Sequence, residues 1–399
     1  MDKQEDDVMT RHILTGLDQL IQKGKGFLKG KRIGLLANPA SVTADLVHAL
    51  SILRNLYPED LAALFSPQHG FFAQKQDNMI ESGHFVDPDL NIPVFSLYSE
   101  TRKPTREMFD LIDILLVDLQ DTGCRVYTFI YTVSYCMELA AKTGKEVMIL
   151  DRPNPIGGVQ VEGNILEDRM ASFVGRFPVP MRHGLTMGEI SGLFNEEFGI
   201  GCDLSVLPMA GWQRKMYFTD TGLEWILPSP NLPTPASCKV YPGQVIFEGT
   251  NLSEGRGTTL PFEFLGAPWL DTDRIKQAVE NRGRGFFLRP AVFEPTSGKW
   301  AGESCRGFQI HVTDKWKYRP YKTALLIQQE IIRAHPDDFE LKPPPYEYEY
   351  EKMPLDLILG SRTLREQLFG MTDMDEMEKQ WEERLNRYME TAREFHLYE

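Results

Sequence analysis

Short apolar runs alternate with amphipathic stretches along roughly the first 150 residues of the chain. Five runs have the length and composition of buried strands, at 31–37, 61–65, 93–98, 112–119 and 146–150. Apolar residues at helical spacing lie between them, at 45–55, 105–111 and 128–143. This alternation predicts an α/β fold with a mostly parallel, doubly wound sheet and helices on both faces.

The pattern changes after Asn164. Apolar spacing there predicts helices at 187–198, 318–334 and 374–395, and strands at 203–209 and 307–313. The stretch 228–268 is rich in Gly, Pro, Asn and Ser, which indicates a long functional loop region. The segment 343–351, PPPYEYEYE, predicts an extended acidic stretch on the surface. We therefore expect an α/β domain over 1–164, followed by a smaller α+β domain over 165–399 that includes the Pro-rich segment and a C-terminal helix.

Polar side chains follow several predicted strands directly. Because the carboxyl ends of parallel strands share one edge of the sheet, and ligands bind beside that edge, these residues predict a single cleft. A role in helix capping is the alternative for either Asp118 or Asp121. We expect the cleft to lie between the two domains and to be lined by His69, Glu81, Asp118, Asp121, Arg125 and Arg256.

Composition narrows the function classes. The chain has 399 residues, 42% of them hydrophobic, and a formal net charge of −14, which argues against general nucleic-acid or anionic-membrane binding. No apolar run is long enough for a membrane span. The N-terminal segment is acidic and shows no secretory signal, so we expect a cytoplasmic protein; an exported protein with a trimmed signal is the open alternative. Oligomeric state cannot be read from the sequence.

Three further segments concentrate polar side chains: 67–81 (PQHGFFAQKQDNMIE), 181–189 (MRHGLTMGE) and 248–263 (EGTNLSEGRGTTLPFE). In the second, Thr186 and Glu189 are spaced as a helix capping box, which leaves Arg182 and His183 without that explanation. The third combines three carboxylates with Arg256 and three Gly, and Gly lets the backbone approach a ligand closely.

Several catalytic classes lack their motifs. GxGxxG, the P-loop, HExxH and GxSxG are all missing, so we expect no nucleotide cofactor, no metal and no serine-hydrolase elbow. The five Cys residues are scattered, and Cys124 is interpreted as a small buried residue. Carboxylates beside aromatic side chains remain, and paired carboxylates suit glycoside hydrolysis. A non-catalytic sugar-binding protein and a metal-dependent hydrolase are the alternatives.

The order and length of several motifs resemble the bacterial exo-β-N-acetylmuramidase family of the NamZ type, formerly a domain of unknown function. The motifs are PQHGFFAQKQDNMIESG, SLYSETRKPT, DLQDTGCRVYTFIYT, LDRPNPIGG, PMRHGLTMGE, LPSPNLPT, YPGQVIFEGTNLSEGRGTTLPFEFLGAP and QIHVTD. The resemblance spans about Gly16 to Pro345. It implies a Rossmann-like N-terminal domain, an α+β C-terminal domain, a cleft between them, and release of N-acetylmuramic acid from the non-reducing end of peptidoglycan fragments. A saccharide or muropeptide is then the expected substrate.

Many family members have Glu where this chain has Gln68, so we assign the general acid to Glu81, with His69 beside it. Glu254 or the pair Asp118 and Asp121 would supply the second carboxylate, and Asp121 or Gln120 could instead orient the acetamido group for internal attack. Four arginines are candidates to bind the lactyl carboxylate of muramic acid: Arg125, Arg152, Arg182 and Arg256. The other expected substrate contacts are Asn38, Gln68, Asn78, Tyr127, Asn154, His183, Asn231 and Asn251.

Overall fold

A computed structural model describes residues 12–72, 83–99 and 102–399. Its largest sheet has seven strands in the order β3-β4-β2-β1-β5-β6-β9. All neighbouring pairs are parallel except β3 with β4. The strands are β1 (Ile33–Ala37), β2 (Leu61–Ser66), β3 (Phe85–Val86), β4 (Pro93–Ser96), β5 (Ile114–Asp118), β6 (Glu146–Leu150) and β9 (Asp203–Leu207). The predicted mostly parallel sheet is confirmed.

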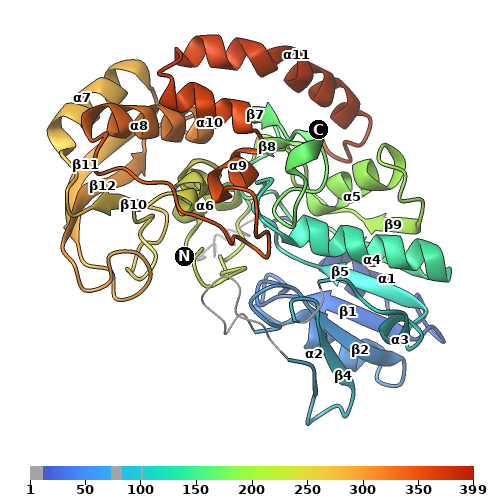
Figure 1. Ribbon diagram of the computed structural model, residues 1–399. Coiled ribbons are helices and arrows are strands. Elements are labelled where there is room, and N and C mark those ends of the chain that lie inside the picture. The colour runs from blue at the N-terminus through green and yellow to red at the C-terminus, as the bar shows by residue number, and fades with distance from the viewer. Residues whose placement is uncertain (1–11, 73–82, 100–101) are drawn as a thin grey trace, which may run out of the picture.

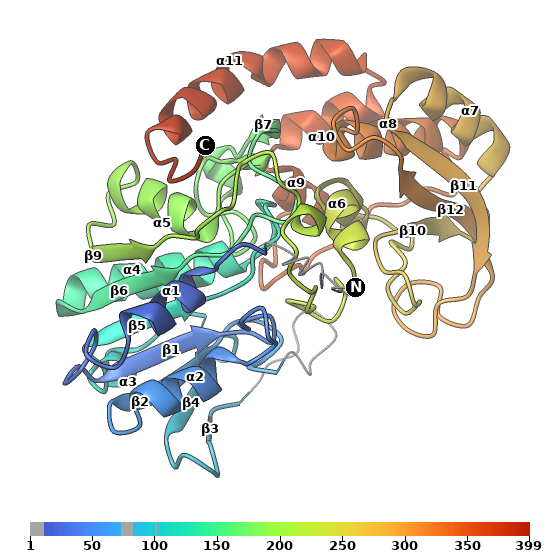
Figure 2. The ribbon, with the colours of Figure 1, turned by 180° about the vertical axis from the view of Figure 1, so that it is seen from behind.

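Helices cover both faces of this sheet (Figures 1 and 2). Alternate residues of β1 divide between the two cores: Leu35 packs with the face that carries α1 and α2, and Leu36 with the opposite face. This division arises because successive side chains of a strand point to opposite sides. The helices of the first face are α1 (Gly16–Lys23) and α2 (Ala49–Leu56), and those of the second are α3 (Arg106–Phe109), α4 (Phe129–Thr143) and α5 (Met187–Glu196).

The seventh strand of the sheet comes from beyond the expected domain boundary at Asn164. Strand β9 pairs in parallel with β6 from Glu146 to Leu150. A small antiparallel ribbon, β7 (Glu162–Ile165) with β8 (Pro180–Arg182), lies between these strands in the chain. The domain boundary at residue 164 stays a prediction. The seven-stranded sheet is completed by β9, whose residues follow that boundary in the sequence.

The second part of the chain is built on a three-stranded antiparallel sheet, ordered β10-β12-β11 (Figure 1). Its strands are β10 (Phe264–Ala267), β11 (Phe286–Phe293) and β12 (Cys305–Val312). The helices of this part are α6 (Pro235–Gln244), α7 (Thr272–Arg282), α8 (Pro320–Ala334), α9 (Pro354–Leu359), α10 (Arg362–Phe369) and α11 (Met374–Arg393), with short 3-10 turns η1 (Asp168–Met170), η2 (Phe218–Asp220) and η3 (Val245–Gly249). An α+β second domain is confirmed.

The C-terminal helix α11 brings the chain end back to the first domain (Figures 1 and 2). The Tyr398 hydroxyl donates a hydrogen bond of 2.6 Å to Asp151, which follows β6. The Leu397 amide donates to Glu189 of α5 at 3.0 Å. Within the described ranges, every helix is too short or too polar to cross a bilayer.

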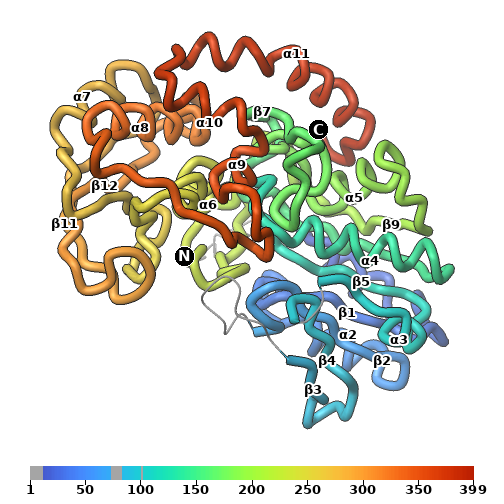
Figure 3. Tube along the Cα trace, viewed as in Figure 1, coloured from blue at the N-terminus to red at the C-terminus, as the bar shows by residue number. Residues whose placement is uncertain are grey.

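Two expectations about irregular segments are wrong. The stretch 228–268 contains α6, η3 and β10; Thr234 and Ser237 form a capping box and Pro235 occupies the first helical turn, which starts α6 despite a weak apolar pattern. The segment 343–351 does not simply lie on the surface, because Tyr346 and Glu347 are buried. Figure 3 follows this segment from α8 to α9 across the front of the molecule.

Candidate active site

A pocket lies where the two parts of the chain meet. It encloses about 460 Å³ of space, counting its open mouth. Gln68 and His69 reach it from the end of β2, and Tyr127 and Thr128 from the turn before α4. The second part adds α6 and the loop before it, η3, the loop before β10, and the segment between α8 and α9. These last segments contribute Ser229, Asn231, Leu232, Tyr241, Glu248, Arg256, Phe262, Tyr346 and Glu347.

Glu347 is held on the pocket wall by two donors from the first domain. The Gln68 side-chain amide donates to one carboxylate oxygen at 3.1 Å, and the Tyr98 hydroxyl donates to the other at 2.6 Å. Thr128 donates to the Gln68 carbonyl oxygen at 2.8 Å, which fixes the orientation of the amide. Burial raises the pKa of Glu347, and the hydrogen bonds from Tyr98 and Gln68 offset only part of this rise. Glu347 is therefore biased toward its protonated form.

Glu248 is the second carboxylate on the pocket wall. Arg256 donates to one of its oxygens at 2.6 Å, and the Tyr346 hydroxyl donates to the other at 2.7 Å. Burial alone would raise the pKa of Glu248, but the charge and hydrogen bond of Arg256, together with Tyr346 and Lys299, lower it overall. Glu248 is therefore biased toward its ionised form, and its negative charge in turn raises the pKa of Glu347.

Glu254 stands behind this pair. The Arg256 Nε lies 3.3 Å from one Glu254 oxygen, and Lys299 donates to the other at 2.8 Å. Lys299 also donates to the backbone carbonyls of Phe247 and Leu252, at 2.7 and 2.8 Å. Two carboxylates and two cations thus alternate in the interior, which fixes the Gly-rich loop of the second domain against the pocket.

Backbone strain gathers around the pocket. His69, Glu347 and Tyr348 all have positive φ, at 75°, 46° and 66°. A side chain in this region costs on the order of 1–3 kcal/mol and tends to persist where a site requires it. At Glu347 the strained backbone places its carboxylate between Gln68 and Tyr98.

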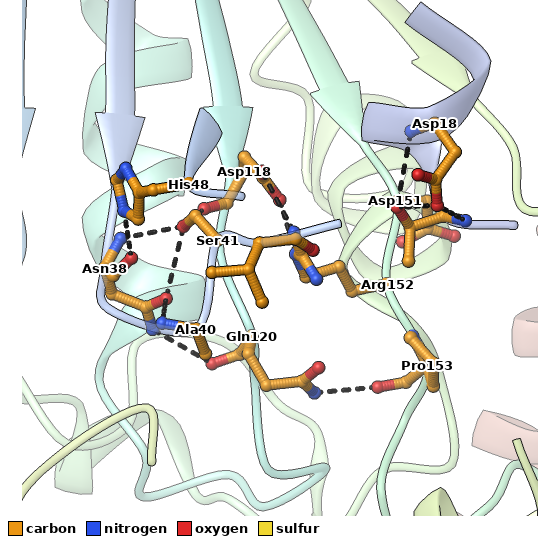
Figure 4. A network of polar contacts seen from close by, with 12 residues as sticks. Asp18, Asn38, Ala40, Ser41, His48, Asp118, Gln120, Asp151, Arg152 and Pro153 are labelled. Atoms are coloured by element: carbon orange, nitrogen blue, oxygen red, sulfur yellow. Dashed lines mark hydrogen bonds and ion pairs between the residues drawn. The ribbon is translucent and has the colours of Figure 1, made fainter. Parts of the chain in front are cut away.

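A separate polar network lies at the carboxyl ends of the neighbouring strands β1 and β5, where the strand order reverses (Figure 4). Arg152 forms a two-pronged ion pair with Asp118, in which its Nη2 donates at 3.1 Å. Ser41 donates to the Asp118 backbone carbonyl. Asn38 accepts from the Ala40 amide at 3.1 Å, and the Gln120 amide donates to Pro153 at 2.8 Å. These side chains bind one another and join the loops that follow β1, β5 and β6.

The sequence matches two family profiles in succession. Residues 33–236 match the N-terminal part of exo-β-N-acetylmuramidase NamZ, and residues 239–398 match the C-terminal part. The chain is also 42% identical over 387 residues to the peptidoglycan β-N-acetylmuramidase NamZ of Bacillus subtilis strain 168, covering 97% of this chain and 91% of that protein. The chain belongs to the NamZ exo-β-N-acetylmuramidase family. It is a glycosidase of that family.

Two solved structures share the fold of this NamZ-family chain. Both are DUF1343 family proteins from Bacteroides fragilis NCTC 9343. One superposes with a TM-score of 0.88 at 34% identity, covering 98% of this chain and all of the other. The second gives a TM-score of 0.75 at 28% identity, covering 97% and 99%.

The pocket of this NamZ-family chain brings together only some of the residues expected from the sequence. Gln68, His69, Tyr127, Asn231 and Arg256 line it, and Glu254 contacts Arg256 from behind. Glu81 and Asn78 lie outside the described residues, so their roles stay predictions. The other expected residues contact partners away from this pocket. They are Asn38, Asp118, Gln120, Asp121, Arg125, Arg152, Asn154, Arg182, His183 and Asn251, none of which is in the pocket lining.

Three of the four arginines expected to hold a substrate carboxylate already have partners within the protein, and their role in substrate binding stays a prediction. Arg125 is fully buried and donates to the backbone carbonyls of Asn164, Val179, Ile358 and Leu359, at 2.8–3.1 Å. Arg182 donates to Gln160 at 2.7 Å and to Tyr217 at 3.0 Å. Arg152 pairs with Asp118. Even Arg256, which lines the pocket, is already paired with two carboxylates.

Asp118 and Asp121, the expected catalytic pair, likewise have partners within the protein, and their catalytic role stays a prediction. Asp118 forms an ion pair with Arg152. Asp121 accepts a hydrogen bond from the Gly123 amide at 2.7 Å, and its carboxylate lies 3.4 Å from the His183 Nε2. The His183 Nδ1 accepts from the Leu185 amide at 3.2 Å, which indicates a neutral ring with its proton toward Asp121. Both side chains are buried. They stabilise the turn after β5.

Two asparagines expected to bind substrate form hydrogen bonds to the protein backbone. Asn154 donates to the Leu185 carbonyl at 2.9 Å, and Asn251 donates to Asp338 at 2.8 Å while accepting from the Glu340 amide at 3.1 Å. Two minor expectations are confirmed. Thr186 and Glu189 form the capping box of α5, and Cys124 is buried with its thiol pKa raised to about 12 by burial.

Sequence reasoning missed Glu347, Glu248 and Tyr346. Glu248 opens the Gly-rich motif 248–263, from which the sequence pattern favours Glu254; the catalytic role of Glu254 stays a prediction. Glu347 lies in a segment whose alternating Tyr and Glu resemble an exposed strand. Among the described residues no three His, Cys, Asp or Glu side chains converge as metal ligands.

Proposed function

We propose that this glycosidase removes N-acetylmuramic acid from the non-reducing end of peptidoglycan fragments, and that the bond is cleaved in the pocket lined by Glu248 and Glu347. The observation that carries the assignment is the opposite bias of two carboxylates in one pocket. Burial favours the protonated form of Glu347, and Arg256 favours the ionised form of Glu248. Environments that separate two pKa values in this way divide acid and base roles between them.

Glu347 is the proposed proton donor to the glycosidic oxygen. Glycoside cleavage needs an acid because the departing sugar alcohol is a poor leaving group unless its oxygen is protonated. Tyr98 and Gln68 hold the carboxylate after the proton has left, since both donate to its oxygens. The same hydrogen bonds keep the acid in one orientation.

Glu248 is the proposed anion beside the sugar ring. An oxocarbenium-like transition state carries positive charge at the anomeric carbon, and a fixed carboxylate stabilises that charge. Arg256 and Tyr346 each donate to Glu248 and prevent it from taking up a proton or turning away. Glu254 acts one step further back, because it shares Arg256 and anchors Lys299.

The purified protein incubated with a disaccharide of N-acetylmuramic acid β-linked to N-acetylglucosamine tests the function. We expect free N-acetylmuramic acid and N-acetylglucosamine in equal amounts. The assignment is tested with Glu347→Gln, with Glu81→Gln as the rival acid, and with Glu351→Gln as a control on the same segment, where Glu351 is exposed. Loss of turnover in Glu347→Gln with an active Glu351→Gln supports Glu347.

Two results would count against the proposal. No release of N-acetylmuramic acid by the wild-type protein refutes the substrate. Full activity of Glu347→Gln together with an inactive, folded Glu81→Gln moves the acid to Glu81, as the sequence alone predicts.

A further inference from the structure

A second pocket lies on the other side of Glu347. It holds about 740 Å³ of space, counting its open mouth, and Glu347 forms part of its wall as well as part of the first. Its remaining walls are mainly cationic and aromatic, and they also include one further carboxylate. They are formed by Arg102, Lys103, Tyr135, Ser172, Phe173, Tyr348 and Glu349. A sugar whose glycosidic oxygen lies at Glu347 therefore has a substituent-sized space beside it.

Arg102 is the feature of this pocket that the fold does not explain. Its guanidinium carbon lies 3.1 Å from the centre of the Tyr348 ring and 5.6 Å from that of Tyr98. Its Nε is buried and has no hydrogen-bond acceptor among the described residues. Buried donors in folded proteins are almost always satisfied, so an orphaned one calls for a partner.

The nearby carboxylates are already engaged. Both oxygens of Glu347 accept from Gln68 and Tyr98. Glu349 accepts from the backbone amides of Glu351 and Lys352, and the Lys352 amine lies 3.5 Å from it. In the part of the chain that the structure describes, no carboxylate forms an ion pair with Arg102. The guanidinium thus lies over the Tyr348 ring in the wall of the second pocket.

Muramic acid carries a free carboxylate, which is the kind of partner that Arg102 is without among the described residues. It differs from glucosamine by a lactyl ether that ends in a carboxylate. The arginines expected to bind that group already donate to backbone carbonyls or to Asp, Glu, Gln or Tyr side chains. A guanidinium held flat by stacking is well suited to bind a carboxylate through two parallel hydrogen bonds.

We propose that Arg102 binds the lactyl carboxylate of the terminal muramic acid and so sets the preference for this sugar over N-acetylglucosamine. The inference rests on the proposed function and deepens it. Tyr98 links the two roles, because its ring centre lies 5.6 Å from the Arg102 guanidinium and its hydroxyl donates to Glu347. A substrate that binds Arg102 is thereby aligned with the proton donor.

Two aryl β-muraminides test the proposal, one with a free lactyl carboxylate and one in which that group is a neutral N-methylamide. For the wild-type protein we expect higher kcat/KM on the acid. Arg102→Met should lower kcat/KM on the acid by about 10- to 100-fold, mainly through KM, because the charge-assisted hydrogen bonds to the lactyl carboxylate are lost. It should change kcat/KM on the amide by less than about threefold, and Arg102→Lys should recover part of the loss.

Arg176 supplies a matched control. It also stacks on an aromatic wall of this pocket, 3.8 Å from the Tyr135 ring centre, but already pairs with Glu138 at 2.5 Å. Arg176→Met should leave the ratio of the two substrates unchanged. Equal losses on both substrates in Arg102→Met would overturn the role of Arg102. Failure of the wild-type protein to cleave either substrate would instead refute the proposed function.

Discussion

Replacing the proposed acid should produce a defect that depends on the leaving group. In Glu347→Gln the proton donor is lost, while the pocket keeps its shape. The structure predicts a folded variant: Tyr98 can still donate to the amide oxygen, and one hydrogen bond from Gln68 is disturbed, which costs about 1 kcal/mol. Removing a buried acid whose ionisation is disfavoured offsets part of that cost.

The catalytic loss should be larger. General acid catalysis contributes about 10²- to 10⁴-fold, or about 3–5 kcal/mol in the barrier. This loss applies to a departing sugar, whose oxygen must be protonated. A dinitrophenyl β-muraminide needs little protonation, because dinitrophenolate is a stable anion. We therefore expect Glu347→Gln to lose about 100-fold or more on the disaccharide and less than about tenfold on the dinitrophenyl substrate.

The pH profile gives an independent check of the same residue. Wild-type kcat/KM on the disaccharide should fall at alkaline pH as Glu347 loses its proton, and the variant should lack this alkaline limb. Initial rates on both substrates across the pH range measure both effects. Equal losses on the two substrates, or an unchanged alkaline limb, would show that Glu347 is not the acid.

Two further predictions concern residues outside the pocket. Arg125→Met removes the donor to four buried backbone carbonyls, so urea unfolding should show a free energy of unfolding lower by about 3 kcal/mol. At a temperature where the variant is folded, its KM should stay within about twofold of the wild-type value. A large increase in KM without loss of stability would contradict the structural role. Burial raises the pKa of Asp151 to about 6, above its value in the unfolded chain. The contribution of Asp151 to the free energy of unfolding should therefore fall by about 3 kcal/mol as pH rises from about 4 to about 6. Asp151→Asn should remove that decline, and an identical pH dependence in the variant would refute this prediction.

The sheet could be predicted because its information is local. Each buried parallel strand is a short apolar run, and Ile112–Leu119 was found from that pattern alone; it contains β5. Helix α6 was missed because its start depends on capping by Thr234 and on Pro235, and its apolar spacing is weak. Capping chemistry was recognised only at Thr186, where an amphipathic pattern followed it.

The polar residues at the ends of the strands could be located from the sequence, but their partners could not. Asp118 ends β5 and Arg152 follows the neighbouring β6, yet the two residues bind each other at the carboxyl ends of these strands (Figure 4). Residue type alone does not distinguish a carboxylate that will face substrate from one that will neutralise an arginine 34 positions away. The distinction is made by tertiary contacts.

Glu347 shows the same limit more sharply. Its hydrogen-bond partner Gln68 is 279 residues away in the sequence, and neither segment has a pattern that refers to the other. The alternation of Tyr and Glu near Glu347 resembled a solvated strand. The signal that could have identified it is the aromatic content: Tyr346 and Tyr348 flank a carboxylate directly after three prolines, an unusual composition for a purely exposed segment.

The most direct test of the central claim is a crystal structure with a non-cleavable substrate, in which sulfur replaces the oxygen between N-acetylmuramic acid and N-acetylglucosamine. We expect the muramic acid ring in the pocket between Glu248 and Glu347, with the Glu347 carboxyl group within about 3.5 Å of the linking sulfur, since a proton donor must reach the atom that it protonates. A ring bound elsewhere, or a linking sulfur that faces Glu81 and leaves Glu347 without contact, would contradict the account.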